Sequence, residues 1–237
     1  MFLSIDYLIY MIPAFLLMAL TSWYVKSAYA RWSRVAARSQ LTGYQAAQKL
    51  AARTGLYGIQ IQGTTGNLSD HYDPRTKTLR LSRGVAETPS VAAMAITAHE
   101  LGHALQDAEG YFPLRFRSAL VPMVNIGSNL GWVLIMIGLL LASSGMAFGT
   151  DIAWLGVVAF AGGAFFALAT LPVELNASRR ARQLLADTGL VQGEDEQRGV
   201  NTVLNAAALT YVAGLVTAVL QLLYFVGLVG GVGRRRR

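Results

Sequence analysis

Two histidines lie four residues apart in the segment His99-Glu100-Leu101-Gly102-His103, with a glutamate directly after the first. On a helix this spacing puts both imidazoles on one face, where they can bind one zinc ion. A glutamate at this position can act as general base on a zinc-bound water. We expect a helix over residues 91–108, because Thr88 and Pro89 supply an N-cap and a first helical position. Two merely structural histidines are the alternative, and the placement of the whole motif on a helix argues against it.

The third zinc ligand must be a histidine or a carboxylate, because the chain has no cysteine and only three histidines. A catalytic zinc site uses three protein ligands and keeps a fourth position for water. We expect Glu174 to be the third ligand, since it opens a polar segment directly after a long apolar run, and His71 is the alternative. Asp107 and Glu109 are expected to be solvated surface charges, because their offsets from His103 turn them away from the metal.

A tetrahedral intermediate also requires a hydrogen-bond donor for its oxyanion. His71 lies at a turn before a predicted strand and is one candidate for this role, with Tyr72 and Arg179 as rival donors. A lone loop histidine is usually just a polar surface residue. His71 is thus a candidate both for the third metal ligand and for the oxyanion donor.

The composition indicates a membrane protein, because 54% of the residues are apolar and only 14% are charged, against about 25% charged in a typical soluble domain. Four uncharged runs are long enough to span a bilayer: residues 7–25, 118–142, 152–173 and part of 200–232, where an interfacial helix precedes the span. The first run lacks the basic start and short apolar core of a cleaved signal peptide. Basic residues flank these runs instead of forming a separate basic domain, which argues against a nucleic-acid partner.

Four spans place the two long polar segments, residues 26–117 and 174–198, on the same side of the membrane. These segments hold twelve and four Lys and Arg residues, whereas the loop at residues 143–150 holds none. The positive-inside rule therefore predicts that both segments lie in the cytoplasm and that the protein is a multi-pass protein of the cell membrane. The basic residues 234–237 oppose this orientation, since four spans would place them outside.

The segment of residues 26–117 is expected to be a small catalytic lobe. Residues 27–54 show helical spacing of apolar positions, and residues 57–63 and 76–82 alternate as strands do. The turn signal at Asp73 and Pro74 suggests that the two strands form a hairpin. An extended substrate could pair with the edge of this sheet at residues 76–82. The expected fold class is mainly α: a multi-span helical membrane protein with a small α+β zincin-like metallopeptidase lobe.

Four segments, residues 68–82, 92–122, 171–185 and 204–214, together resemble the YugP-type membrane zinc metallopeptidases. More distantly, they resemble the HtpX-like and CAAX-prenyl membrane proteases. The resemblance implies that His99, His103 and Glu174 bind Zn²⁺ and that Glu100 is the base in peptide-bond hydrolysis. The distant relatives carry an aspartate four residues after the glutamate ligand, where this chain has Ser178, so no carboxylate is identified that would orient a ligand histidine.

The predicted function is that of a membrane zinc metalloendopeptidase acting on a protein or peptide substrate, in contact with membrane lipid. A zinc-binding membrane scaffold or regulator without turnover is the alternative from another class. A transporter is less consistent with the sequence, because no charged residue lies inside any predicted span and ion pathways commonly need one. The substrate and the oligomeric state are not determined by the sequence.

Overall fold

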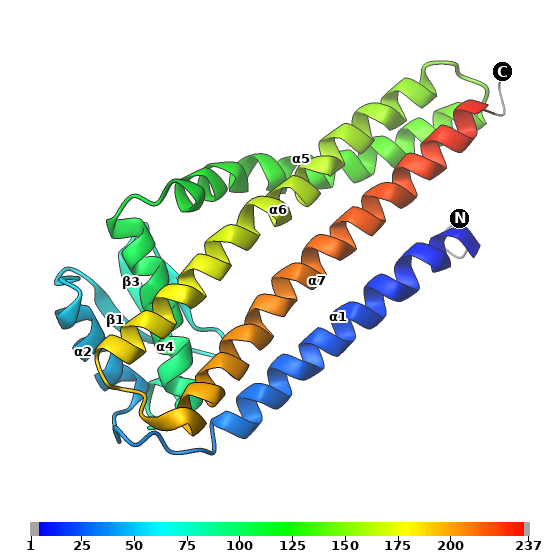
Figure 1. Cartoon of the computed structure of the whole chain (residues 1–237). Coiled ribbons are helices and arrows are strands. Elements are labelled where there is room, and N and C mark those ends of the chain that lie inside the picture. Colours follow the sequence, from blue (N-terminus) through cyan, green and yellow to red (C-terminus); the bar gives the residue numbers. More distant parts are fainter. Residues whose placement is uncertain (1–4, 235–237) are drawn as a thin grey trace. The chain divides into compact units, whose positions relative to one another are not determined.

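The computed structural model describes residues 5–234 of the chain (Figure 1). The described chain forms two compact units: a helical unit, made of the residues up to 20, residues 116–171 and those from 211 onward, and a lobe, made of residues 21–115 and 172–210. The predicted fold class, mainly α with a small sheet, is confirmed. In chain order the elements are α1 (Ile5–Trp32), α2 (Gly43–Arg53), β1 (Gln60–Thr64), β2 (His71–Asp73), β3 (Thr78–Ser82), α3 (Arg83–Ala86), α4 (Val91–Ala108), α5 (Phe112–Ser143), α6 (Gly149–Asp187) and α7 (Gly193–Arg234).

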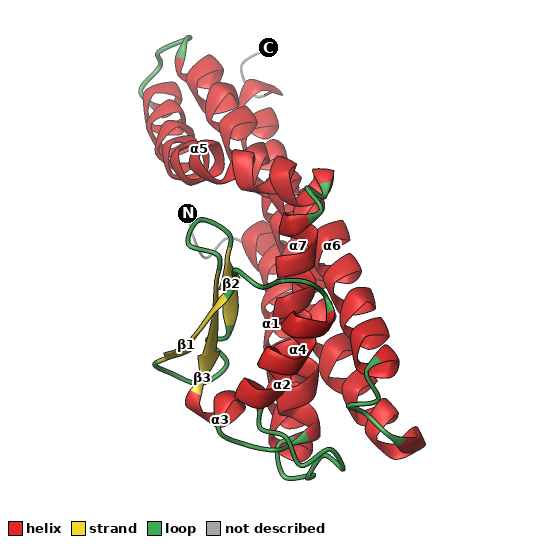
Figure 2. Ribbon diagram, turned by 90° about the vertical axis from the view of Figure 1, so that its left-hand side faces the viewer, coloured by secondary structure: helices red, strands yellow, loops and turns green. Residues whose placement is uncertain are grey.

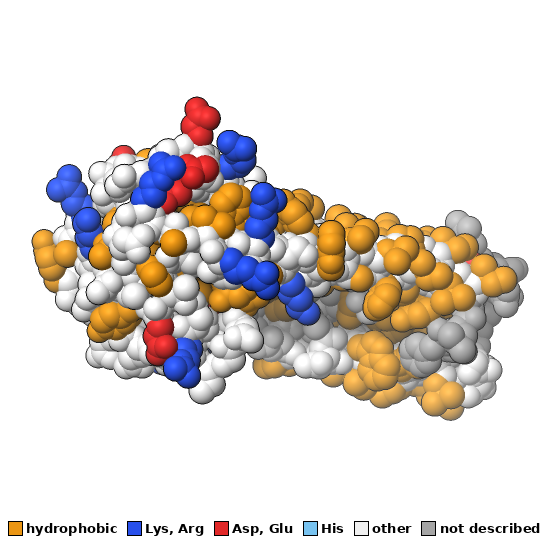
Figure 3. Space-filling model, turned by 90° about the horizontal axis from the view of Figure 1, so that it is seen from below, with side chains coloured by type: hydrophobic (Ala, Val, Ile, Leu, Met, Phe, Trp, Pro, Cys, Tyr) orange, Lys and Arg blue, Asp and Glu red, His pale blue; other side chains and the backbone are white. Residues whose placement is uncertain are grey.

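Four helices, α1, α5, α6 and α7, are long and apolar enough to cross a membrane. Large apolar side chains of these helices remain exposed, among them Ile126, Leu140 and Val158. On the face shown in Figure 3, the surface of the helical unit is largely apolar, and the Lys, Arg, Asp and Glu side chains gather on the lobe. A soluble monomer rarely exposes so much apolar surface. These helices therefore have the outer faces expected of lipid-exposed segments.

Small residues allow α5 and α6 to approach closely in the helical unit. A Cβ atom on Gly131 would lie 2.6 Å from the backbone nitrogen of Phe160, and one on Gly156 would lie 2.6 Å from that of Ile135. Such contacts between helix backbones are typical of membrane helices, where close packing replaces the hydrophobic effect. The described part of this unit also has a small buried cluster that includes Tyr224 and Phe225.

The prediction of one helix over residues 27–54 is wrong. Helix α1 ends at Trp32, and α2 begins after its N-cap, Thr42. The Thr42 side chain accepts from the backbone of Gln45, and the Gln45 side chain accepts from the backbone of Thr42. This capping box starts a new helix by satisfying two otherwise unpaired N–H groups. The polar segment of residues 174–198 is divided between two helices, because α6 ends at Asp187 and α7 starts at Gly193.

The predicted hairpin of residues 57–63 and 76–82 is wrong, because the sheet has three strands in the order β1-β3-β2. Strand β2 pairs antiparallel with β3, and β1 pairs parallel with β3 on its other side. The Asp73 carboxylate accepts hydrogen bonds from the Arg75 N–H and the Thr76 hydroxyl, which stabilises the tight turn that joins β2 to β3. Strand β3 is therefore central, so the predicted free edge at residues 76–82 does not exist.

Helix α4 forms the centre of the lobe, and Figure 2 shows it beside α2 and the sheet. Its own core residues, including Met94 and Leu101, pack with Leu50 of α2, with Leu79 of β3 and with Leu185 of α6. The Ser90 side chain caps the N-terminus of α4 by accepting from the Ala93 N–H. The buried position of α4 holds the residues of its 99–103 segment in place.

Candidate metal centre

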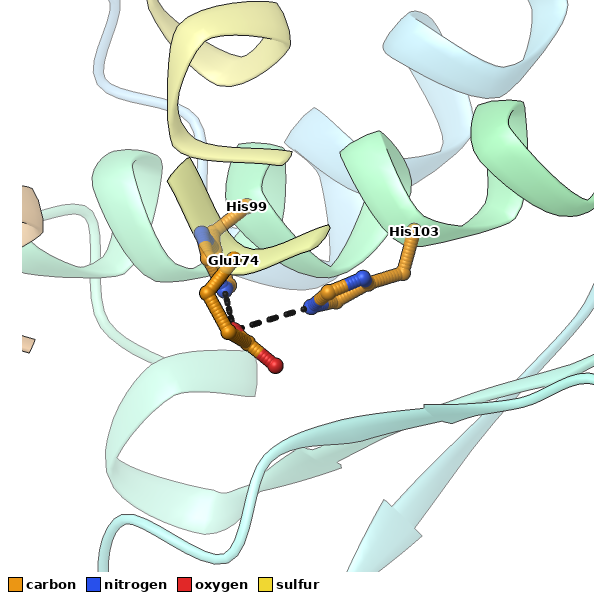
Figure 4. Close-up of side chains that lie close together, drawn as sticks. All are labelled: His99, His103 and Glu174. Carbon is orange, nitrogen blue, oxygen red and sulfur yellow. Dashed lines mark ion pairs between the residues drawn. The ribbon is translucent and has the colours of Figure 1, made fainter. Parts of the chain in front are cut away.

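Three side chains converge where α4 meets α6 in the lobe (Figure 4). They are His99 and His103 of α4 and Glu174 of α6, and one possible ligand atom from each lies within 4.8 Å of the others. The Glu174 Oε2 atom is 3.3 Å from His99 Nε2 and 3.4 Å from His103 Nε2. Glu174 is only 3% exposed. The structure thus brings together the three side chains that the sequence suggested as metal ligands.

One face of α4 contacts α6 at this point. On α4, His99, Gly102, His103 and Gln106 have the i, i+3, i+4, i+7 spacing that defines one helix face. A Cβ atom on Gly102 would lie 2.6 Å from the carbonyl oxygen of Ala177 on α6. The backbones of α4 and α6 are therefore in contact between the ligand residues, and this contact allows a glutamate of one helix to reach two histidines of the other.

A buried amide holds the ring of His103. The Gln106 side chain is fully buried, and its Oε1 atom lies 3.0 Å from His103 Nδ1. Its Nε2 group donates to the Val173 carbonyl at 2.9 Å and to Asn176 Oδ1 at 2.9 Å. Since a carbonyl oxygen only accepts, the amide must point its nitrogen to Val173 and its oxygen to His103. His103 Nδ1 therefore carries a proton, which leaves Nε2, beside Glu174, as the ring atom that can bind a metal.

The ring of His99 has a corresponding neighbour on α6. The Ser178 hydroxyl lies 3.2 Å from His99 Nδ1, and Ser178 is itself buried. A histidine whose Nδ1 is engaged in this way presents Nε2 to a metal in a fixed orientation. Both ring nitrogens that approach Glu174 are thus Nε2 atoms, and both Nδ1 atoms are held by neutral side chains.

These residues fit a zinc ion. Among the described residues, the buried Glu174 Oε2 atom has no hydrogen-bond partner, although two ring nitrogens lie beside it. A buried carboxylate oxygen beside two ring nitrogens is unfavourable unless positive charge lies between them, and a metal cation bound to all three groups supplies it. Two imidazoles and one carboxylate are also the protein ligands of many catalytic zinc sites, with a fourth position left for water.

Glu100, directly after His99, lies beside the three candidate ligands but is not one of them. Its Oε2 atom accepts a hydrogen bond from the backbone N–H of Tyr72 at 3.0 Å, which ties the carboxylate to strand β2. Burial raises the pKa of Glu100 above that of an ordinary glutamate, against the opposing effect of His99 and His103. A carboxylate held in this way can accept a proton close to the metal position.

A model of the family described as "Putative neutral zinc metallopeptidase" matches residues 7–230. The chain belongs to this family. The curated "Putative membrane protease YugP" of Bacillus subtilis (strain 168) is 41% identical over 202 residues, which make up 85% of this chain and 87% of that protein. No solved structure matches the chain. Membership in the neutral zinc metallopeptidase family confirms the resemblance to YugP-type proteins and, with the four apolar helices, supports a membrane protein.

The structure places the three predicted oxyanion donors in different surroundings. Tyr72 pairs with the fully buried Leu79 across β2 and β3, so its side chain faces the core. His71 faces the other side of the sheet, because successive strand residues alternate. The His71 ring is exposed, with Nδ1 2.8 Å from the Ser69 carbonyl. Arg179 is exposed, and its five-residue offset from Glu174 turns it by about 140° around α6.

The prediction that Asp107 is a solvated surface charge is wrong. Asp107 is half-buried, and its Oδ2 atom accepts a hydrogen bond from the Tyr72 hydroxyl at 2.8 Å. Burial, together with this bond, raises the pKa of Tyr72, so the phenol keeps its proton for Asp107. Glu109 is exposed as predicted, but it forms a two-bond ion pair with Arg180.

Sequence reasoning missed Gln106 and found no role for Ser178. Their spacing in the sequence could have identified both residues, because Gln106 lies three residues after His103 and Ser178 lies four residues after Glu174. These offsets place each residue on the same helix face as the ligand that precedes it. Which ring each one contacts depends on how α4 and α6 cross, and no local pattern shows that.

Proposed function

We propose that the chain is a membrane zinc endopeptidase in which His99, His103 and Glu174 hold the metal. The observation that carries the proposal is the buried, unpaired Glu174 Oε2 atom beside two Nε2 atoms whose rings are held from the opposite side. When bound, zinc supplies a water of lowered pKa and a Lewis acid for the scissile carbonyl. Membership in a family of putative neutral zinc metallopeptidases supports the same reaction.

Glu100 is the general base in this proposal. Its carboxylate takes a proton from the attacking water and returns it to the nitrogen of the leaving amine, as one residue can do in both halves of peptide hydrolysis. The Tyr72 N–H holds one carboxylate oxygen and leaves the other to accept the proton. The raised pKa of Glu100 favours the first of these roles, since a stronger base takes the proton from the water more readily.

The substrate in this proposal is a protein or peptide, and the protein works within a lipid membrane without a nucleic-acid partner. The lobe lies on the cytoplasmic side of the cell membrane. This orientation is supported by the distribution of Lys and Arg, which are numerous in residues 26–117 and 174–198 and absent from residues 143–150. The four long apolar helices are the reason to expect a multi-pass rather than a peripheral attachment.

The test compares the purified wild-type protein with Glu100→Gln and Glu174→Gln, using zinc analysis and cleavage of an unfolded protein substrate with and without a chelator. We expect Glu100→Gln to keep zinc but lose activity by about a hundredfold or more, the scale of a general base. Glu174→Gln should lose zinc on dialysis. Glu87→Gln is the matched control, because Glu87 is exposed and forms an ion pair with Arg83, away from the candidate metal ligands.

A fully active Glu100→Gln protein would exclude the assignment of the base. A wild-type protein that retains zinc in stoichiometric amounts but cleaves nothing would favour the alternative of a zinc-binding scaffold. A wild-type protein that binds no zinc at all would exclude both the peptidase and the zinc scaffold.

A further inference from the structure

The lobe contains a pocket of about 320 Å³ beside the part of α4 that is C-terminal to the metal ligands. One wall is the loop of residues 55–59 between α2 and β1, and another is formed by Tyr72 and Lys77. The floor is one face of α4, formed by Ala104, Asp107 and Ala108 at i, i+3 and i+4. None of the candidate metal ligands lines this pocket, so it is a feature separate from the metal centre.

The pocket lies next to the proposed reaction site. Asp107 is four residues after His103 on α4, which places it about one helical turn, or about 5 to 6 Å, further along the helix. Tyr72 contacts both the reaction site and the pocket, since its N–H donates to Glu100 and its side chain lines the pocket. Alternate side chains of an extended peptide are about 6.6 Å apart. A peptide with its scissile bond at the metal can therefore place a nearby side chain in the pocket.

The chemistry of the pocket combines an apolar wall with one fixed negative charge. Leu56, Tyr57 and the ring of Tyr72 supply apolar and aromatic surface, and aromatic faces also attract cations. Asp107 is held in place by the Tyr72 hydroxyl, and among the described residues it has no Lys or Arg partner. Asp107 is also the one carboxylate among the lining residues.

Lys77 is the opposing charge, and it is exposed at the turn that leads into β3. An exposed lysine keeps its ammonium group in water on a flexible stem, so it weakens the field of Asp107 without neutralising it by contact. The fixed, half-buried carboxylate therefore decides which charge the pocket prefers.

We propose that this pocket, the Asp107 pocket, binds a lysine or arginine side chain of the substrate close to the scissile bond. Such a side chain has an apolar stem that fits against Leu56 and the two tyrosine rings, and a cationic end that pairs with Asp107. The assignment rests on the proposed peptidase function, and it names the substrate class as peptides with a basic residue beside the cleavage point.

The experiment measures peptide binding separately from cleavage. Zinc-loaded, full-length Glu100→Gln protein in detergent is titrated with fluorescein-labelled ten-residue Ala/Gly peptides that carry a single Lys, Leu or Glu at each position in turn. A second series measures cleavage of the same peptides by the wild-type protein. We expect the Lys peptide to bind about two- to fivefold more tightly than the Leu and Glu peptides at one position, the scale of a partly exposed ion pair.

Three substitutions then assign the preference to the pocket. Asp107→Asn keeps an acceptor for the Tyr72 hydroxyl but removes the charge, so the ratio of Lys-peptide to Leu-peptide affinity should fall to near one. Lys77→Met should raise this ratio, because it removes the opposing charge. Glu109→Gln is the matched control on the same helix, and it should leave the ratio unchanged, because Glu109 is exposed, pairs with Arg180 and does not line the pocket.

Two results would overturn the Asp107 pocket as a basic subsite: equal binding of the Lys, Leu and Glu peptides at every position, or a preference for Lys that survives Asp107→Asn. Failure of the peptidase function gives a different result. The wild-type protein would then cleave none of the peptides, although the Glu100→Gln protein would still bind the Lys peptide with the expected dependence on Asp107. Absence of all peptide binding would overturn the pocket assignment.

Discussion

At the scale of residues, the unusual feature of the centre is that neutral groups orient both histidines. In many zinc sites a carboxylate accepts from the ligand histidine and raises its basicity. Here Gln106 and Ser178 take these places. Neutral partners donate less electron density to the imidazoles, so the bound metal should keep more of its Lewis acidity while the rings remain fixed.

The first residue-scale prediction concerns Gln106→Leu. This substitution removes the acceptor from His103 Nδ1 and leaves the Val173 carbonyl without its side-chain donor. We expect zinc affinity to fall by about ten- to a hundredfold, the usual effect of losing a group that orients a ligand. Competition with a chromophoric chelator measures the affinity. Gln48→Leu, at an exposed position of α2, is the control, and an equal loss of affinity in both variants would contradict the assignment.

At the scale of elements, the distance between α4 and α6 determines whether the centre forms. Gly102 permits the contact, because any larger residue would collide with the Ala177 backbone. Gly102 lies between the two ligands of α4, and Ala177 lies three residues after the ligand of α6. A small separation of the two helices would therefore move Glu174 away from both histidines together.

Gly102→Ala tests this contact. Alanine is favoured over glycine in an isolated helix by about 1 kcal/mol, but overpacking costs about 1 to 3 kcal/mol. We expect a lower midpoint of thermal unfolding in detergent and weaker zinc binding. Gly214→Ala in α7 is the matched control, since nothing described lies within 4 Å of its added Cβ, and it should leave the midpoint unchanged or raise it. A Gly102→Ala protein that behaves like this control would show that the contact does not limit the site.

The turn between β2 and β3 supplies an element-scale prediction about pH. Hydrogen bonds from Thr76 and Arg80 hold the pKa of Asp73 at about 2, below its ordinary value of 3.8. Because the folded pKa is the lower one, Asp73 stabilises the turn above about pH 4, and this contribution is lost as the pH falls toward 2. The protection of the amide hydrogens of residues 71–82 against exchange, measured relative to the intrinsic exchange rate at each pH, should fall over that range. Asp73→Asn should show this low protection already at pH 5, and wild-type protection in the variant at pH 5 would contradict the explanation.

At the scale of the whole molecule, the distribution of charge predicts which side of the membrane each loop faces. The chain contains no cysteine, so a single introduced cysteine carries the only thiol. We expect a membrane-impermeant maleimide to label Ser144→Cys in intact cells and to label Gln48→Cys only after the cells are opened. Both positions are exposed in the structure. Labelling of Gln48→Cys in intact cells would reverse the proposed orientation.

The sequence alone determined the features that depend on local pattern. The His99-Glu100-Leu101-Gly102-His103 segment shows its chemistry through helical spacing, and the four apolar runs show the class of protein through length and hydropathy. Glu174 could be suggested because it follows directly on such a run. Each of these signals lies within a few helical turns of chain, where spacing along the sequence and position in space are nearly the same thing.

Only the tertiary structure decided the features that depend on pairing across long stretches of chain. The contacts of Gln106 with Val173, of Ser178 with His99 and of Tyr72 with Asp107 join residues 67, 79 and 35 positions apart. The strand order is another example, since a three-residue β2 has too little sequence for a pattern and yet displaces β1 to the far edge of β3. Such contacts are selected by how helices and strands pack, and the packing is a property of the whole lobe.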